Sequence, residues 1–448
     1  MSMTTPTRYR PAEVSRVGEH AVVVGASMAG LLAARVLADG FDHVTVLDRD
    51  ELPANGTVRR GVPQGRQPHA LLQAGKDVLE ALFPGFGDEV MRDGGLELDV
   101  GTESRVFDQG GFLAAPTTRR TLFGVSRPLV EAVARRRLTE HDRVHLRGGC
   151  QLVDHLLRGR SQVGGVVVQD GAEDREEIGA DLVVDATGRA TRTPAWLAAH
   201  GFAAPPTDEV RIDVGYVTRI LERPEDDRRN YLVPPAAPDT RGGVLLPVES
   251  GRWLLTLAGV HGDHPPSDRR GFAEYAASLP SPVLAEALAD HPEVGETPDR
   301  YRFVANVRHR YEDLDRLPDG LVAIGDAIAS FNPVYGQGIS VAALEAVELH
   351  RALVQGGDQD LPRRFFAAAG GVVEGAWRSA VGGDFRFLQT EGSKPSGTDL
   401  TNRYLARLVR RAQTDPELAD TFTSVMFMTA PPSRLFRPST VWRTLRPG

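Results

Sequence analysis

The chain has 448 residues, 41% hydrophobic and 25% charged, which is the composition of an ordinary globular protein. Its net charge of −8 excludes the basic footprint that nucleic-acid binding requires. The single cysteine, Cys150, excludes an intrachain disulfide and a multi-cysteine metal site. No apolar run reaches the ~18 residues that span a bilayer, and the N-terminus has no signal-peptide core. We therefore expect a cytoplasmic protein of two or three domains, without a metal site.

A strand, a glycine turn and a helix follow one another near the N-terminus. Residues 21–24 are apolar, Gly25-Ala-Ser-Met-Ala-Gly30 is the turn, and an alanine- and leucine-rich stretch follows. The turn is a G-x-S-x-x-G form of the dinucleotide fingerprint, with Ser27 at the second glycine position. Asp48 ends the next strand, where it can accept hydrogen bonds from ribose hydroxyls. The pattern predicts a βαβ unit that binds a pyrophosphate at the helix N-terminus; the alternative is a tight turn without a ligand.

Two later strands also end in glycine turns. Residues 181–184 lead into Asp185-Ala-Thr-Gly188, and residues 321–324 lead into Gly325-Asp326. The turn at residues 333–338 then precedes a long helix that begins near Ile339. An aspartate at a strand end can bind a sugar alcohol, and a glycine turn at a helix start presents amides to an electron-rich ring. Because short alternating strands separate these units, we expect a discontinuous nucleotide-binding domain with an inserted domain.

On these motifs the chain resembles the flavoprotein monooxygenases of the para-hydroxybenzoate hydroxylase type (group A), including squalene-epoxidase-like and polyether-epoxidase-like members. The resemblance covers most of residues 20–355. It implies FAD as the cofactor, with NADPH or NADH as a transient co-substrate. It also implies that the first turn faces the FAD pyrophosphate, that Asp48 binds the adenosine ribose and Asp326 the ribityl chain, and that Arg127 heads a helix near the phosphates. The cofactor-binding residues expected on this basis are Gly25, Ser27, Met28, Ala29, Gly30, Asp48, Arg49, Arg60, Arg127, Thr187, Gly188, Gly325, Asp326, Pro333, Gly336, Gln337 and Gly338.

The chain departs from the family pattern in one place. Residues 185–188 read D-A-T-G, as in reductase and halogenase relatives, where aromatic hydroxylases have a D-G segment. The W-x-W-x-I-P segment of flavin halogenases is absent. No second G-x-G-x-x-G follows a strand, so we do not expect a permanent NAD(P)H domain.

The segment from Arg59 to His69, R-R-G-V-P-Q-G-R-Q-P-H, resembles one that guards the flavin in epoxidase-like relatives. The alternative is a charged surface loop. His69 and Arg60 are the candidates for a catalytic role, although a lone histidine is more often a hydrogen-bond partner at a helix start. No other side-chain base stands out, so the flavin itself is expected to perform the chemistry.

The expected fold class is α/β: a discontinuous Rossmann-like FAD-binding domain, a β-sheet substrate domain and a C-terminal helical segment. The FAD-binding parts are residues 18–94, 121–204 and 318–356, the substrate domain comprises 95–120 and 205–317, and the helical segment is 357–448. That last segment is aromatic-rich. It packs on the core, forms a lid over an apolar substrate, or contacts a membrane surface; the sequence leaves the three open.

The expected activity is FAD-dependent monooxygenation with NAD(P)H and molecular oxygen, through a flavin C4a-hydroperoxide. The substrate is expected to be an apolar polyketide or terpenoid of secondary metabolism, such as antibiotic biosynthesis. Epoxidation is favoured over hydroxylation because residues 59–66 and 332–338 resemble the epoxidase branch. One alternative is an FAD-dependent reductase or dehydrogenase of the same fold that inserts no oxygen, and another is a non-enzymatic flavin-binding protein. The sequence does not fix the oligomeric state.

Overall fold

A five-stranded parallel sheet forms the centre of the larger lobe. The computed structural model describes residues 9–53, 56–69, 71–171 and 174–446. The strand order is β17-β11-β1-β2-β7, and every neighbouring pair is parallel. The strands are β1 (Gly18–Val24), β2 (Phe41–Leu47), β7 (Val144–Arg147), β11 (Leu182–Asp185) and β17 (Leu321–Ala323). Because parallel strands end at the same edge, the turns that follow β1, β2, β11 and β17 meet there.

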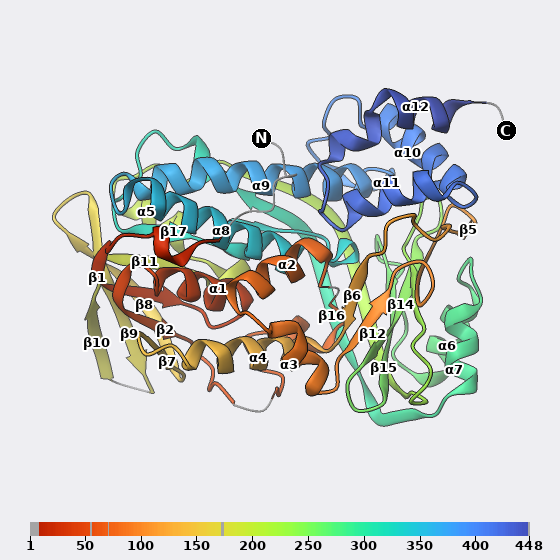
Figure 1. Cartoon of the computed structure of the whole chain (residues 1–448), viewed down its shortest axis with the longest axis horizontal. Coiled ribbons are helices and arrows are strands. Elements are labelled where there is room, and N and C mark those ends of the chain that lie inside the picture. The colour runs from red at the N-terminus through yellow and green to blue at the C-terminus, as the bar shows by residue number, and fades with distance from the viewer. Residues whose placement is uncertain (1–8, 54–55, 70, 172–173, 447–448) are drawn as a thin grey trace.

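Helices from distant parts of the chain pack together beside this sheet (Figure 1). Helix α1 contacts α4 and α8, and α8 contacts α2 and α9. A three-stranded antiparallel sheet meets β11 through β9. The helices of this lobe are α1 (Met28–Leu37), α2 (Gln73–Leu82), α3 (Phe86–Arg92), α4 (Arg127–Thr139), α5 (Thr193–Ala199), α8 (Gly338–Gly356) and α9 (Leu361–Asp384), and the antiparallel strands are β8 (Cys150–Arg158), β9 (Gln162–Asp170) and β10 (Asp174–Gly179). Their fully buried apolar residues form one continuous core.

A nine-stranded sheet forms the second lobe, in the order β18-β16-β12-β15-β14-β13-β4-β5, with β19 paired to β12. Helices α6 (Arg269–Ala277) and α7 (Val283–Asp290) cover it and bury a core around Trp253 and Phe272. The strands are β4 (Ser104–Asp108), β5 (Gly111–Phe112), β12 (Thr207–Glu222), β13 (Asn230–Val233), β14 (Arg241–Val248), β15 (Arg252–Gly259), β16 (Glu293–His309), β18 (Ala329–Ser330) and β19 (Glu391–Gly392); β3 (Leu96–Asp99) and β6 (Thr121–Gly124) form a separate pair. The predicted α/β fold class is confirmed.

The C-terminal segment crosses from the first lobe to the second. Helix α9 runs along the top of the larger lobe in Figure 1, and α10 (Thr398–Ala412), α11 (Pro416–Met426) and α12 (Pro438–Leu445) gather beyond its end. Strands β18 and β19 lie in segments predicted as FAD-binding and helical, yet both extend the sheet of the second lobe. Within the described residues, none of the helices is long and apolar enough to cross a membrane. Short 3-10 helices complete the structure: η1 (Pro11–Glu13), η2 (Pro63–Arg66), η3 (Gly188–Ala190), η4 (Tyr311–Asp313), η5 (Gly325–Ala327), η6 (Pro333–Tyr335) and η7 (Pro432–Phe436).

Candidate active site

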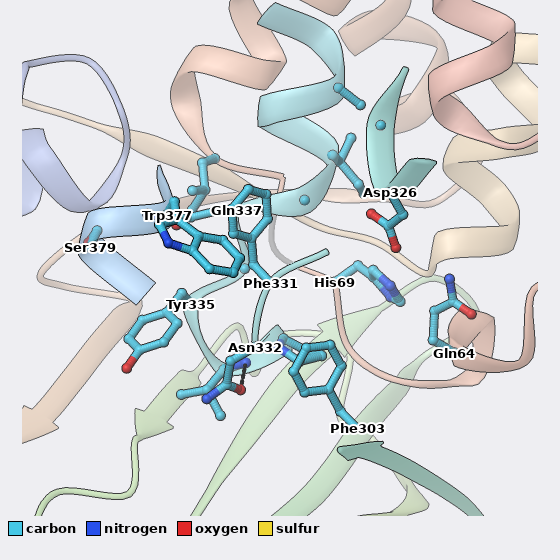
Figure 2. A pocket seen from close by; sticks show the side chains of 18 of the residues that line it. Gln64, His69, Phe303, Asp326, Phe331, Asn332, Tyr335, Gln337, Trp377 and Ser379 are labelled. Carbon is cyan, nitrogen blue, oxygen red and sulfur yellow. Dashed lines mark hydrogen bonds between the residues drawn. The ribbon is translucent and has the colours of Figure 1, made fainter. Parts of the chain in front are cut away.

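A cavity of about 1810 Å³ begins at the carboxyl edge of the parallel sheet and continues between the lobes to the C-terminal helices. Pockets for a single small molecule usually measure ~300–1,000 Å³, so this cavity has room for a cofactor together with a substrate. Figure 2 shows Phe303, Phe331 and Trp377 around its central space, with Asp326 and His69 on another side. The predicted cofactor residues that line it are Gly25, Ser27, Met28, Ala29, Asp48, Arg49, Arg127, Thr187, Gly188, Gly325, Asp326, Pro333, Gly336, Gln337 and Gly338.

The glycines of the first turn have different tasks. Gly25 has φ +112°, and a Cβ there would lie 2.3 Å from the carbonyl oxygen of Ala186. A Cβ at Gly30 would lie 1.8 Å from the Gly25 carbonyl oxygen, so Gly30 lets helix α1 pack on its own turn and does not line the cavity. No side chain caps the N-terminus of α1. Its first amides are therefore free to bind an anion.

Buried charges surround this helix start. Arg127 donates to the Ser27 hydroxyl at 2.9 Å and to Glu131 at 2.8 Å. Arg59 donates to Glu131 at 3.0 Å and to Asp48 at 2.9 Å. Burial opposes ionisation of Glu131, but the two arginines outweigh it and hold the pKa of Glu131 at about 2. Two guanidinium groups and the helix N-terminus together suit a pyrophosphate.

A cofactor contact was expected of Arg60, but its neighbour Arg59 is the arginine that lines the cavity. Arg59 is buried in the charge cluster and lines the cavity, whereas Arg60 is exposed and does not line it. Neighbouring residues in a loop point in different directions, and nothing in the local sequence distinguishes them. Glu131 was also missed, although its position four residues after Arg127 on a helix is a recognisable ion-pair spacing.

The Asp48 carboxylate already accepts hydrogen bonds from neighbouring groups of the protein. The donors are the amides of Ala26 and Asp50, at 2.7 and 2.9 Å, in addition to Arg59. Asp48 thus fixes the first turn, and its bond to a ribose stays a prediction. Cys150 donates its amide to the Asp48 carbonyl, so the start of β8 lies beside this end of the cavity. Leu152 and Val153 of β8 line the cavity there and form an apolar wall that the sequence analysis did not identify.

Asp326 is a carboxylate that lines the cavity without a partner. Within the described residues, no hydrogen bond or ion pair reaches its side chain. Burial raises the pKa of Asp326, and Arg189 and Arg127 oppose that rise. The Thr187 hydroxyl, by contrast, is already bound to Asp185 at 2.6 Å. A desolvated carboxylate with free acceptors fits a hydroxyl-bearing chain such as the ribityl group of FAD.

The turn from Pro333 to Gly338 forms the opposite wall. Gly336 adopts the left-handed φ of +63°, and Gln337 buries a side-chain oxygen that lacks a hydrogen bond within the described residues. A Cβ at Gly338 would meet nothing within 4 Å, so the backbone is open to the cavity there. No side chain caps α8. This uncapped helix start and the unpartnered groups at Asp326 and Gln337 form a cradle that fits FAD.

A buried carboxylate from α9 holds this turn. Asp384 accepts hydrogen bonds from Asn306 at 2.7 Å, Asn332 at 2.8 Å and the Tyr335 hydroxyl at 3.0 Å. The Asn332 side-chain oxygen in turn accepts a hydrogen bond from the Val334 amide at 3.1 Å. Burial raises the pKa of Asp384 to about 6, against the three hydrogen bonds. No sequence pattern pointed to this cluster, because its members lie far apart along the chain.

His69 lines the cavity but suits no acid role at neutral pH. Its Nδ1 donates to the Gln67 carbonyl at 2.8 Å. Burial, with Arg127 nearby, lowers the pKa of His69 to about 4. The neutral ring therefore keeps Nε2 as a hydrogen-bond acceptor. This hydrogen bond lies in the loop before α2, which begins at Gln73, so His69 is not a partner at a helix start, and its catalytic role stays a prediction.

Beyond the turn from Pro333 to Gly338 the cavity becomes mostly apolar. The polar groups on its wall include Arg105, Arg386, Tyr216 and Gln67, and the Gln67 side-chain nitrogen has no partner within the described residues. The apolar lining comes from both lobes and the C-terminal helices: Val244, Leu246, Phe303, Phe331, Trp377, Leu405, Val409, Phe422 and Met426.

Comparisons with known proteins agree with this geometry. Residues 19–357 match the model of a family described as an FAD binding domain. Protein Rv3254 of Mycobacterium tuberculosis (strain ATCC 25618 / H37Rv) is 34% identical over 430 residues, which is 91% of this chain and 90% of that protein. The flavin-dependent brominase Bmp2 superposes with a TM-score of 0.67 at 15% identity, covering 95% of this chain and 97% of that one. The p-nitrophenol 4-monooxygenase PnpA from Pseudomonas putida DLL-E4 gives 0.63 at 16% identity, covering 93% and 99%. At such identities the two structures show a shared fold.

Proposed function

Because the chain belongs to the FAD binding domain family of group A flavoprotein monooxygenases, like para-hydroxybenzoate hydroxylase, we propose that it is an FAD-dependent monooxygenase. It uses NADPH or NADH and molecular oxygen to epoxidise or hydroxylate an apolar substrate of the polyketide or terpenoid class. The observation that carries the proposal is the single cavity that joins the cofactor-binding turns to an apolar chamber.

Different residues of the chain would bind different parts of the cofactor. Arg127, Arg59 and the N-terminus of α1 would hold the pyrophosphate, and Asp326 would accept hydrogen bonds from the ribityl hydroxyls. The Gly336 amide already donates to the Pro333 carbonyl at 3.0 Å, so the Gly338 amide at the N-terminus of α8 would stabilise negative charge on the ring. When bound, FAD supplies two-electron redox chemistry and activates oxygen.

The apolar chamber has two consequences for the reaction. Its aromatic and aliphatic lining, with Phe303, Phe331 and Trp377 at the centre, excludes water from the reacting atoms. The same lining favours a substrate that is apolar and large, because the volume exceeds what a cofactor alone would need. His69 is neutral at physiological pH and accepts rather than donates, which suits oxygen transfer to an alkene because that reaction needs no side-chain acid.

The test is turnover under oxygen-18 gas with NADPH or NADH, using a panel of apolar alkenes and phenols. We expect a product that carries one oxygen-18 atom for each nicotinamide consumed beyond the peroxide side reaction. A product that has been reduced or dehydrogenated without oxygen-18 would replace the proposal with the reductase or dehydrogenase alternative. The FAD-free protein is the control, and it should give no product.

A further inference from the structure

The C-terminal helices carry a charge opposite to that of the whole protein. Residues 398–446 contain eight arginines and four carboxylates, in a chain whose net charge is −8. Arg403 has no hydrogen bond or ion pair within the described residues, and its side chain is exposed. Such a local excess of arginine complements an anionic surface.

Large apolar side chains are exposed on the same helices. Leu400 is 68% exposed, Trp442 63%, Leu445 49% and Phe436 46%. On α10, Leu400, Arg403, Arg407 and Arg410 recur at three- and four-residue spacing, so they share one face of the helix. The buried residues Leu408, Val409 and Ala412 occupy the other face.

Contacts between α10, the segment around Phe436 and the end of α12 join these elements into one surface. The Phe436 and Tyr404 rings lie 5.3 Å apart, which places Phe436 against α10. Arg407 donates to the carbonyls of Thr444 and Leu445, both at 2.9 Å, so the end of α12 abuts the exposed face of α10. Figure 1 shows α12 on the outer side of α10, away from both sheets. We define the C-terminal patch as Leu400, Arg403, Arg407, Phe436, Trp442 and Leu445.

The cavity extends to this patch. Leu405 and Val409 of α10, on the face opposite the arginines, line the cavity, as does Phe422 of α11. Phe436 both lines the cavity and reaches the surface. The end of the cavity that is farthest from the parallel sheet is therefore bordered by exposed apolar and cationic side chains.

We propose that the C-terminal patch docks on an anionic lipid bilayer, with Leu400, Phe436, Trp442 and Leu445 in the interface and Arg403 and Arg407 at the lipid phosphates. Tryptophan and leucine beside arginine are the composition of an interfacial helix surface. The long arginine side chains place their charge among headgroups while their methylenes cover apolar area. An acidic protein would match the charge equally well, but it would leave the exposed tryptophan and leucines without an apolar environment.

Docking places the outer end of the cavity on the lipid surface. An apolar substrate dissolved in the bilayer then reaches the chamber without crossing water. This route rests on the proposed function, whereas the docking itself does not depend on any activity.

The test is co-sedimentation of the FAD-loaded protein with vesicles of phosphatidylcholine alone or phosphatidylcholine mixed with phosphatidylglycerol. We expect binding only to the mixed vesicles, and loss of that binding at high salt. Trp442→Ser and Arg403→Glu should each weaken binding about tenfold, since both side chains are exposed and neither is needed for folding.

Leu388→Ser is the matched control. Leu388 is 98% exposed but lies between α9 and β19, outside the patch, so its variant should bind like the wild type. Absence of binding to anionic vesicles, or equal binding of the wild type and Trp442→Ser, overturns the docking proposal. FAD content, measured on the same samples, should be unchanged in every variant. A failure of docking with normal oxygen insertion leaves the proposed function intact.

Discussion

At the scale of single residues, buried carboxyl groups in and beside the site differ in whether an arginine contacts them. Glu131 is held ionised, at a pKa of about 2, because two arginines outweigh its burial. Asp326 and Glu345 are desolvated without an arginine in contact, and burial raises the pKa of both. The end of the cavity proposed to bind the pyrophosphate therefore holds ionised groups before a ligand arrives, whereas Asp326, at the proposed ribityl end, is an acceptor that would gain from hydroxyl donors.

Asp326→Asn should weaken FAD binding while stabilising the FAD-free protein. A lost charge-assisted hydrogen bond is worth ~1.5–3 kcal/mol, or about ten- to a hundredfold in the Kd for FAD. Because burial raises the pKa of Asp326, its ionised form disfavours folding, so the neutral asparagine should raise the Tm of the apoprotein at pH 7. Fluorescence titration and thermal unfolding measure the two effects. An unchanged Kd for FAD would remove the ribityl role.

Glu345 predicts a pH dependence of stability. It is fully buried in α8, accepts the Gly325 amide at 2.6 Å, and has its pKa raised by burial to about 8. Between the ordinary pKa of a glutamate and 8, the folded protein holds a proton that the unfolded chain has lost, so stability falls as pH rises through this window. In the apoprotein, this titration should lower the free energy of unfolding by roughly 4 kcal/mol across the window, and Glu345→Gln should abolish that decrease.

Chemical unfolding at pH 5 and pH 8 checks the Glu345 prediction. The matched control is Glu274→Gln on the exposed face of α6, which should unfold with the wild-type pH profile. Equal slopes for the wild type and Glu345→Gln would mean that Glu345 is ionised in the folded protein.

At the scale of elements, two helices act on the same turn. Helix α8 begins in the turn and presents its uncapped amides to the cavity. Helix α9, which lies beyond the residues that match the family model, ends in Asp384 and binds the turn from behind. The position of the amides at the start of α8 therefore depends on the packing of a helix outside the matched family region.

Asp384→Asn should displace the turn. The carboxylate accepts three hydrogen bonds, whereas an asparagine has one acceptor oxygen and brings two donors of its own. An unsatisfied buried group costs about 1–3 kcal/mol, so the Kd for FAD should rise about tenfold and its reduction potential should shift. Tyr335→Phe removes only one of the three bonds and serves as the graded control, with a smaller change in both quantities. Wild-type potential and affinity in Asp384→Asn would show that the cluster is only structural.

Gly338→Val tests the other side of the turn. A Cβ at this position meets no protein atom within 4 Å and needs no left-handed backbone, so the free energy of unfolding of the apoprotein should stay within about 0.5 kcal/mol of the wild-type value. The valine would instead occupy the space before the α8 amides. With FAD bound, we expect the reduction potential to fall by tens of millivolts, since helix-end charge effects run ~0.3–2 kcal/mol and 30 mV corresponds to ~1.4 kcal/mol. Redox titration of the FAD-loaded wild type and Gly338→Val measures this difference. Equal reduction potentials would show that the turn has only a structural role.

At the scale of the whole molecule, the cavity joins segments that are distant in sequence. The parallel sheet draws its strands from three stretches of the chain, and the C-terminal helices close the far end of the chamber. A dinucleotide bound in this cavity would contact several of these segments at once. Binding of a dinucleotide should therefore raise the free energy of unfolding of the whole protein.

FAD should stabilise the apoprotein and FMN should not. A ligand at a hundred times its Kd adds ~2.7 kcal/mol, which in a chain of this size raises the Tm by a few °C. FMN lacks the adenosine part and the second phosphate, so it would leave the end of the cavity between Asp48 and Leu152 empty. Differential scanning calorimetry with each cofactor measures the difference. Equal shifts for FAD and FMN would contradict a dinucleotide site.

The sequence by itself determined the parts of this protein whose causes are local. The buried strands turn at Gly25 and Gly325. Each of these glycines has a positive φ, and a Cβ there would clash with another segment of the same chain. The start of α4 at Arg127 follows from the Ser126 cap and the proline after it. Such units, in the right order, were enough to predict the α/β fold class and the FAD family.

Only the tertiary structure decided which side chains face one another. The choice between Arg59 and Arg60 depends on how a loop packs against Glu131. The bonds of Asp384 to Asn306 and Asn332 join residues that are 78 and 52 positions apart, and no local pattern encodes such contacts. The pairing of β18 and β19 with the second sheet and the end of the cavity at α10 have the same origin. Local hydrogen bonding and hydrophobic periodicity set the elements, whereas the burial of distant surfaces against each other sets the site.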